Sequence, residues 1–147
     1  MVGAWQDADA EAFLWDQPIE GSVECLTRLR EAGLPVGVVS NADGRIEEAL
    51  TRAGLRDLLD VVVDSGVVGV AKPDPAIFAH ALTPLGVSAD EAWYLGDTVT
   101  YDAAAADAAG LLSWVVDHKG LHMAHHPRRV ADLREFADVA LAALRRT

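Results

Sequence analysis

The sequence predicts an α/β protein in three layers, with a parallel sheet between helices on both faces. Short, continuous apolar runs alternate along the chain with segments of helical periodicity. Apolar runs without alternation are typical of strands that are buried on both faces, as in parallel sheets. The 147 residues have the size of one domain, and a hydrophobic content of 51% is enough for a sizeable core.

Each predicted element is bounded by residues that start or stop regular structure. The first helix repeats apolar side chains every three or four positions, and Gly33 follows where such a helix ends. Pro75 fits the first position of a later helix, where its missing N–H has no intrahelical partner in any case. In chain order, the predicted elements are helix 19–29, strand 34–40, helix 46–53, strand 60–64, helix 75–82, strand 92–96, helix 101–109, strand 111–116 and helix 130–144.

Composition excludes several classes of protein. Twelve basic and 23 acidic residues give a net charge of −11. This is the wrong sign for neutralising phosphate backbones, so no nucleic acid is expected as a partner. The single cysteine, Cys25, excludes an internal disulfide. No membrane partner is expected either, because the longest apolar runs are too short to span a bilayer and no cleavable signal is visible, so the cytoplasm is the default location.

Polar residues at the carboxyl ends of the predicted strands are the candidates for function, because ligands of open parallel sheets bind there. Ser40 and Asn41 follow the first strand, and Asp64 and Ser65 follow the second. The Ser40 hydroxyl and the backbone N–H groups after it could hold a phosphate oxygen at a helix N-terminus. The alternative is that Ser40 only caps the following helix.

Lys72 and two aspartates complete this set. Lys72 lies in the segment Ala-Lys-Pro-Asp-Pro, where the prolines restrict the backbone and so fix the direction of the ammonium, although an ordinary surface lysine is the alternative. Asp97 ends a strand, and Asp102 falls in the first turn of the helix after it. Two carboxylates there suit Mg²⁺, which prefers hard oxygen ligands, while helix capping by one of them is the alternative.

The order of these motifs closely resembles the haloacid dehalogenase superfamily. They are Ser-Asn after a buried strand, then Lys-Pro-Asp-Pro, then Gly-Asp-x-x-x-x-Asp after another strand. Within the superfamily, the similarity is to the phosphatase-like subfamily I, whose cap domain is inserted early in the chain. The resemblance implies a Rossmann-like core over residues 18–147 and makes residues 1–17 a remnant of the connection from cap to core.

The resemblance also implies roles for the candidate residues. Ser40 and Asn41 would bind the phosphoryl group of a small phosphorylated metabolite, and Lys72 would neutralise its oxygens. Asp97 would reach Mg²⁺, and Asp102 would support the metal site directly or through water. Members of the family work through an aspartyl-phosphate intermediate. The Gly96-Asp97 form favours an Mg²⁺-dependent phosphatase over the metal-free dehalogenases of the same superfamily.

The family's nucleophile motif, Asp-x-Asp-Gly-Thr after a buried N-terminal strand, has no counterpart in this sequence. Asp7 and Asp9 have the spacing, but they lie too close to Ser40 to leave room for a cap. Asp64 follows an apolar run but stands in the place of the family's third strand. We therefore expect a chain that is inactive or incomplete. It is a fragment of a phosphatase, a non-catalytic phosphate-binding or regulatory module, or one half of an enzyme completed by another chain.

The missing nucleophile strand has a structural consequence, because in the family it lies between the strands that correspond here to 36–40 and 93–97. Unpaired buried backbone groups cost about 1–3 kcal/mol each. We therefore predict that these two strands pair directly, or that a second copy fills the slot in a homodimer.

Four histidines cluster after the last predicted strand. They are His118, His122, His125 and His126. Metal binding is conceivable from the spacing of the first two, but the stretch contains a glycine and a proline and lacks a supporting cysteine. A solvent-facing loop is the expectation.

Overall fold

The computed structural model describes residues 2–3, 21–117 and 126–146. The strands are β1 (Val2–Gly3), β2 (Val36–Ser40), β3 (Val61–Asp64), β4 (Trp93–Gly96), β5 (Leu112–Val116) and β6 (Arg129–Val130). The α-helices are α1 (Ser22–Glu31), α2 (Ile46–Arg52), α3 (Ser65–Val68), α4 (Ala79–Leu85), α5 (Ala104–Ala109) and α6 (Leu133–Arg145). Short 3-10 turns are η2 (Arg56–Leu58), η3 (Pro75–Phe78) and η4 (Ala89–Glu91), and η5 (Val99–Ala103) is a π-helical turn.

The strands form one sheet in the order β3-β2-β1-β4-β5-β6, and every pair of neighbours is parallel. The register aligns Ser40 with Asp64 and Gly96 with Val115. The carboxyl ends of β2, β3 and β4 therefore lie at one edge, as the alternation of strands and helices predicted.

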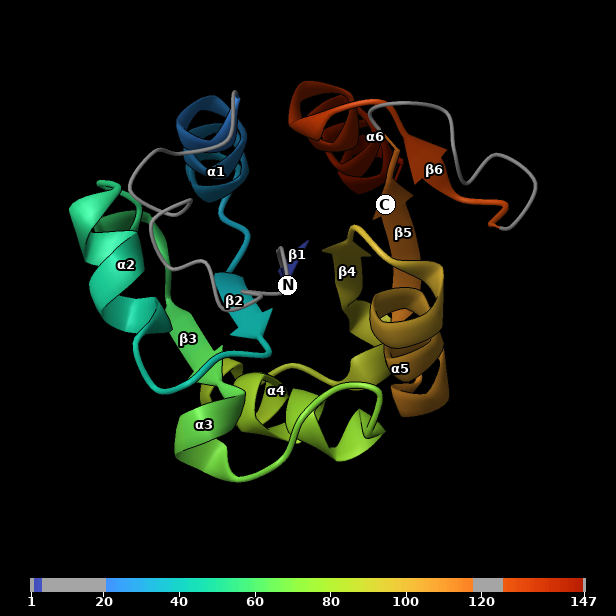
Figure 1. Cartoon of the computed structure of the whole chain (residues 1–147). Coiled ribbons are helices and arrows are strands. Elements are labelled where there is room, and N and C mark those ends of the chain that lie inside the picture. Colours follow the sequence, from blue (N-terminus) through green and yellow to red (C-terminus); the bar gives the residue numbers. More distant parts are fainter. Residues whose placement is uncertain (1, 4–20, 118–125, 147) are drawn as a thin grey trace.

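Helices cover both faces of the sheet, so the α/β prediction in three layers is confirmed. Figure 1 shows α1 and α6 on one side and α4 and α5 on the other. The first core includes the fully buried Leu29, Val36 and Phe136, and the second includes Phe78, Ala81 and Ala105. The sheet residues are buried on both faces because each face meets a layer of apolar helix side chains.

The central position of the sheet holds β1. Val2 pairs with Val36 on one side and Trp93 on the other, and Gly3 pairs with Gly37 and Tyr94. The prediction that the flanking strands pair directly, or that a second copy fills the slot, is wrong at these positions. The chain's own backbone supplies the N–H and C=O groups that the neighbouring strands need there.

This finding changes two further expectations. Residues 2 and 3 are part of the core sheet and not of a connection that precedes it, while residues 4–17 lie outside the described residues. The homodimer stays a prediction, but the gap that suggested it is occupied over this register. A strand of two residues leaves no periodic pattern, and for that reason the sequence did not predict β1.

His126 differs from the expected solvent-facing loop. Only 6% of this residue is exposed, and its Nε2 lies 3.0 Å from the Ser113 hydroxyl, which donates to Asp107. These contacts attach the segment before β6 to β5, where Val115 pairs with Arg129. His118, His122 and His125 lie outside the described residues. Among the helices that the structure describes, none is long and apolar enough to cross a membrane.

Candidate functional site

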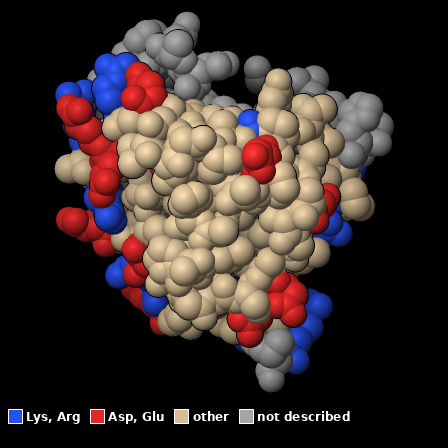
Figure 2. Space-filling view, turned by 90° about the horizontal axis from the view of Figure 1, so that it is seen from below, with Lys and Arg blue, Asp and Glu red and all other residues tan. Residues whose placement is uncertain are grey.

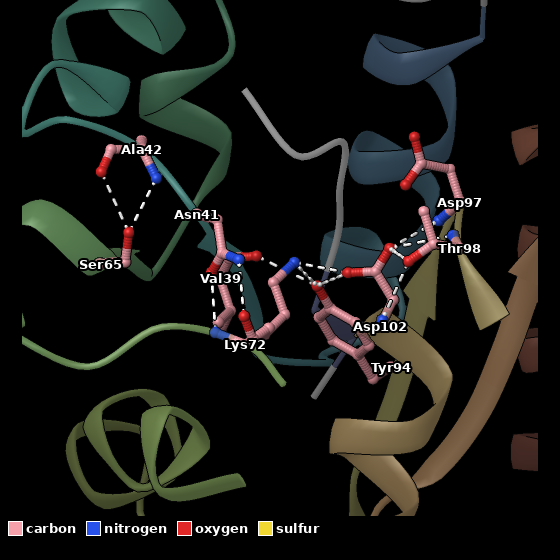
Figure 3. Close-up of polar contacts among 9 residues, drawn as sticks. All are labelled: Val39, Asn41, Ala42, Ser65, Lys72, Tyr94, Asp97, Thr98 and Asp102. Atoms are coloured by element: carbon pink, nitrogen blue, oxygen red, sulfur yellow. Dashed lines mark hydrogen bonds and ion pairs between the residues drawn. The ribbon is translucent and has the colours of Figure 1, made fainter. Parts of the chain in front are cut away.

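Four of the candidate residues lie together at the carboxyl edge of the sheet, as Figure 3 shows for Asn41, Lys72, Asp97 and Asp102. Asn41, directly after β2, holds the backbone of Lys72. Its Nδ2 donates to the Lys72 carbonyl at 2.9 Å, and its Oδ1 accepts from the Lys72 N–H at 2.9 Å. The side chain of Asn41 therefore pairs with Lys72 as a neighbouring strand would, and it fixes the start of the lysine side chain beside the end of β2.

The Lys72 side chain is fully buried, so the alternative of a surface lysine is wrong. Its Nζ donates to Oδ1 of Asp102 at 2.5 Å and to the hydroxyl of Tyr94 at 2.9 Å. A buried ammonium needs such partners, because leaving water removes its hydration. Lys72 thus brings the segment before η3 into contact with the loop after β4.

Asp102 uses both carboxylate oxygens within the protein. Oδ1 receives Lys72, and Oδ2 accepts from the backbone N–H groups of Asp97 and Thr98 and from the Thr98 hydroxyl, at 2.9–3.1 Å. The Thr98 hydroxyl in turn accepts from the Asp102 N–H at 3.1 Å. Thr98 therefore caps the π-helical turn η5, and Asp102 folds the loop after β4 back on itself.

The charge state of Asp102 follows from these contacts. Burial by itself raises the pKa of this carboxyl, but the Lys72 charge and the hydrogen bonds from Lys72, Asp97 and Thr98 outweigh burial and lower the pKa below its usual value. The carboxylate is therefore ionised at neutral pH. It forms a buried ion pair with Lys72.

Gly96 makes this close packing possible. A Cβ atom at position 96 would lie 2.2 Å from the Cβ of Asp102 and 2.7 Å from its Oδ2, which is closer than atoms can approach. Only glycine therefore allows the end of β4 to contact Asp102, and the Gly-Asp motif has a steric reason as well as a chemical one.

Asp97 fits the expected metal in part. Its half-buried carboxylate stands at the end of β4, and its backbone is held by Asp102. Mg²⁺ takes one or two carboxylates and fills its other positions with water and substrate phosphate, so Asp97 can serve as one ligand. Asp102 is already bound by four donor groups of the chain, and a direct role in binding the metal does not fit it. Within the described residues, no group of three or more His, Cys, Asp or Glu side chains could hold a metal.

Ser40 is completely buried at the end of β2, beside Asp64 in the register. The alternative that it caps α2 is wrong, because the residue before α2 is Arg45 and Asp64 provides the capping contacts. Asp64 accepts from the N–H groups of Gly44 and Ile46 at 3.0 and 3.1 Å. The donors at the start of α2 are therefore used by Asp64.

Tyr94 is a site residue that the sequence does not predict. Asp64, a candidate because it follows the second strand, accepts hydrogen bonds from backbone N–H groups, including that of Gly66 at 2.8 Å, so its role is structural. Tyr94 was expected only as part of a buried strand. The available signal was chemical, since a tyrosine inside an apolar strand needs a hydrogen-bond partner for its hydroxyl.

The chain is similar in sequence to known proteins. A family model described as haloacid dehalogenase-like hydrolase matches residues 2–110. The chain is 41% identical over 104 residues to haloacid dehalogenase-like hydrolase domain-containing protein 3 of Mus musculus, covering 71% of this chain and 41% of that protein. It is 36% identical over 135 residues to phosphoserine phosphatase of Thermus thermophilus, covering 86% of this chain and 54% of that protein.

Two further matches extend this picture. Glyceraldehyde 3-phosphate phosphatase of Methanopyrus kandleri is 34% identical over 125 residues, which are 84% of this chain and 53% of that protein. A crystal structure of a HAD phosphatase from Thermococcus onnurineus superposes with a TM-score of 0.80 at 26% identity, over 84% of this chain and 58% of that chain. The chain thus spans about half or less of the length of these curated relatives. Its sheet order, its motifs and the family match together place the chain in the haloacid dehalogenase-like hydrolase family.

Proposed function

We propose that this chain is the phosphate-binding core of an Mg²⁺-dependent phosphatase that acts on a small phosphorylated metabolite. The observation that carries the proposal is the buried Lys72 ammonium, held by Asp102 at the edge of the sheet where Ser40 ends β2. The Lys72 ammonium gives an anion a local hydrogen-bond donor, which the overall net charge of −11 does not offer.

Each residue has a distinct role in this proposal. The Ser40 hydroxyl and the Lys72 ammonium bind the phosphoryl oxygens, and Lys72 neutralises their charge. The side chain of Asn41 is occupied with the Lys72 backbone, so Asn41 acts on the substrate through its own backbone N–H. Asp97 holds the metal, and Asp102 acts indirectly by fixing the backbone at residues 97 and 98.

Mg²⁺, when bound, would supply charge neutralisation for the oxygens of the phosphoryl group. The sequence supplies the hard carboxylate oxygen of Asp97 for this role, but it contains no Asp-x-Asp-Gly-Thr segment. Among the residues that the structure describes, none is therefore assigned the role of the family's nucleophile. We infer that hydrolysis requires a carboxylate from outside the described residues.

The names of two relatives support the substrate class. One is a glyceraldehyde 3-phosphate phosphatase and the other a phosphoserine phosphatase, and both names denote small phosphorylated molecules. A non-catalytic phosphate-binding module is the second candidate. The observation that supports this second candidate is that the sequence contains the proposed anion-binding residues Ser40 and Lys72 but not the nucleophile motif.

Binding of inorganic phosphate, measured by calorimetry in the presence of Mg²⁺, tests the anion site. Ser40→Ala should weaken binding roughly tenfold, because a buried hydroxyl that contacts a charged ligand is lost. Ser88→Ala is the matched control, since Ser88 is exposed and lies before β4, away from the carboxyl edge. Equal affinities of the wild type and Ser40→Ala would contradict the proposal.

Hydrolysis of p-nitrophenyl phosphate separates the two candidates. The chain alone is expected to be no faster than a variant in which Ser40, Lys72 and Asp97 are all replaced by alanine. An Mg²⁺-dependent rate clearly above that variant would show that a nucleophile is present after all. Phosphate binding without hydrolysis, unchanged when an Asp-x-Asp-containing partner is added, would favour the binding module.

A further inference from the structure

Tyr94 places a buried hydroxyl where three parts of the site meet (Figure 3). The hydroxyl oxygen lies 2.9 Å from Nζ of Lys72, 3.1 Å from the Val39 carbonyl and 3.3 Å from Oδ1 of Asp102. Tyr94 belongs to β4, and Val39 is the residue before Ser40 in β2. One hydroxyl thus connects the lysine with the backbone beside the proposed phosphate-binding serine.

The direction of these hydrogen bonds follows from the chemistry of the groups. An ammonium has only donors, so Lys72 donates to the Tyr94 oxygen. The phenol has one proton, and the carbonyl of Val39 at 3.1 Å is the closer of its two acceptors. Oδ1 of Asp102 already accepts from Lys72 at 2.5 Å. Tyr94 therefore accepts from the lysine and donates to β2 at the same time.

The phenol ring is held rigidly. No part of Tyr94 is exposed, and its ring packs edge-on against Phe78 with centroids 4.8 Å apart and planes at 77°. Its backbone is fixed by β5, since Tyr94 aligns with Ser113 in the sheet. The position of the hydroxyl is fixed by the sheet, so Lys72 donates to an acceptor that does not move independently. Asp102, by contrast, stands on the loop after β4.

We propose that Tyr94 is a positioning residue that sets the direction of the Lys72 ammonium relative to Ser40. Asp102 neutralises the lysine, and Tyr94 holds it toward β2, so the two partners have different tasks. Phenylalanine at position 94 would keep the ring and its contact with Phe78 but would remove this bond from Lys72. The phosphate-binding consequence rests on the proposed function, whereas the fixed ammonium does not.

The test compares Tyr94→Phe with Tyr101→Phe. Tyr101 is the second of the two tyrosines and is 50% exposed, so it is a matched control for the loss of one hydroxyl. In the presence of Mg²⁺, Tyr94→Phe should weaken the binding of inorganic phosphate roughly tenfold, while the control stays within about twofold. Unfolding curves of both variants show whether the fold is retained.

A second readout follows the ammonium directly. Lys72 and Lys119 are the two lysines of the sequence, so Lys119→Arg leaves Lys72 as the single source of a lysine ¹⁵Nζ signal. A buried, hydrogen-bonded ammonium should give a sharp, slowly exchanging cross-peak. Tyr94→Phe should shift and broaden it, and Tyr101→Phe should leave it unchanged. An unchanged signal in Tyr94→Phe would overturn the positioning role.

The two readouts separate the possible failures. If the wild type binds no phosphate but the Lys72 signal depends on Tyr94, the proposed function fails and the positioning role stands. If phosphate binds equally well to the wild type and to Tyr94→Phe, the positioning role fails and the proposed function stands.

If Tyr94→Phe does not fold, 3-fluorotyrosine in the Tyr101→Phe protein labels Tyr94 alone. Its ¹⁹F signal should then shift on phosphate addition, and an unchanged signal would overturn the role.

Discussion

The two helical layers of the molecule differ in the number of charged residues that they carry. Helices α1, α2 and α6 carry many charged residues, and exposed ion pairs such as Arg28–Asp138 and Arg134–Glu24 join α1 to α6. In α3, η3, α4 and α5, Asp107 is the single charged residue. Figure 2, viewed from the side of α3 and α4, shows a broad surface with few charged groups except near its margins.

The layer with few charges nevertheless packs on the core next to the ion pair for which we expect the largest effect on stability. Lys72 and Asp102 are completely buried, and their partner Tyr94 belongs to the core beneath α4 and α5. Exposed ion pairs contribute little to stability, because water already solvates both groups. Removing one partner from a buried pair leaves an uncompensated charge inside the protein. The number of charges in a layer is therefore a poor guide to their energetic importance.

The largest expected effect is the loss of the Lys72 charge. Lys72→Met should lower the free energy of unfolding by about 3–5 kcal/mol, because Asp102 would stay buried without its partner. Urea unfolding followed by tryptophan fluorescence measures this. The double variant Lys72→Met/Asp102→Leu is the control, and it should be more stable than Lys72→Met alone. A loss below about 1 kcal/mol in Lys72→Met would show that the pair is effectively solvated.

An intermediate effect is expected from pH. The folded protein lowers the pKa of Asp102 below the usual value of 3.8, so the stabilisation from this carboxylate is complete above that value. It is lost as the pH falls through the lowered, folded-state pKa. The difference in unfolding free energy between the wild type and Asp102→Asn should therefore shrink once the pH drops below about 4. A difference that stays constant across the acid range would contradict the lowered pKa.

The smallest effect is expected in the charged layer. Glu24→Gln removes the exposed pair with Arg134, whose atoms lie 2.8 Å apart with side chains about half exposed. The loss of unfolding free energy should be about 0.2–1 kcal/mol, and added salt should reduce it further. If this variant lost as much stability as Lys72→Met, the contrast between the two layers would not hold.

Much of the fold could be predicted because most strands are long enough to leave a pattern. Strands β2, β3, β4 and β5 are apolar runs, and the glycines after several helices mark their ends. The strands β1 and β6 have two residues each, which is too short for any periodicity. Their places are set by the backbone groups of the neighbouring strands, and this information is not local in the sequence.

The sequence was enough to predict at which edge of the sheet the site lies. It was not enough to predict the hydrogen-bond partners of the site residues. Topology places Ser40 and Asp97 at one edge, because the carboxyl ends of parallel strands share an edge. Lys72 lies beyond the end of β3 and is held at this edge by Asn41 and Asp102. The pattern does not show which partner each group selects. The hydrogen bond from Tyr94 to Val39 joins residues 55 positions apart, and it exists only once β2 and β4 are at their final separation in the sheet. Asp102 was likewise expected near a metal, whereas its oxygens are used within the chain.

The amide of Asn41 has one further consequence. Its nitrogen donates to the Lys72 carbonyl and its oxygen accepts from the Lys72 N–H. The side-chain amide can therefore adopt only one of its two possible orientations. Deamidation to aspartate would exchange the donor for a second acceptor and set a carboxylate oxygen against that carbonyl. Deamidation of Asn41 would thus weaken the attachment of the Lys72 backbone to the end of β2, although aspartate has nearly the same shape as asparagine.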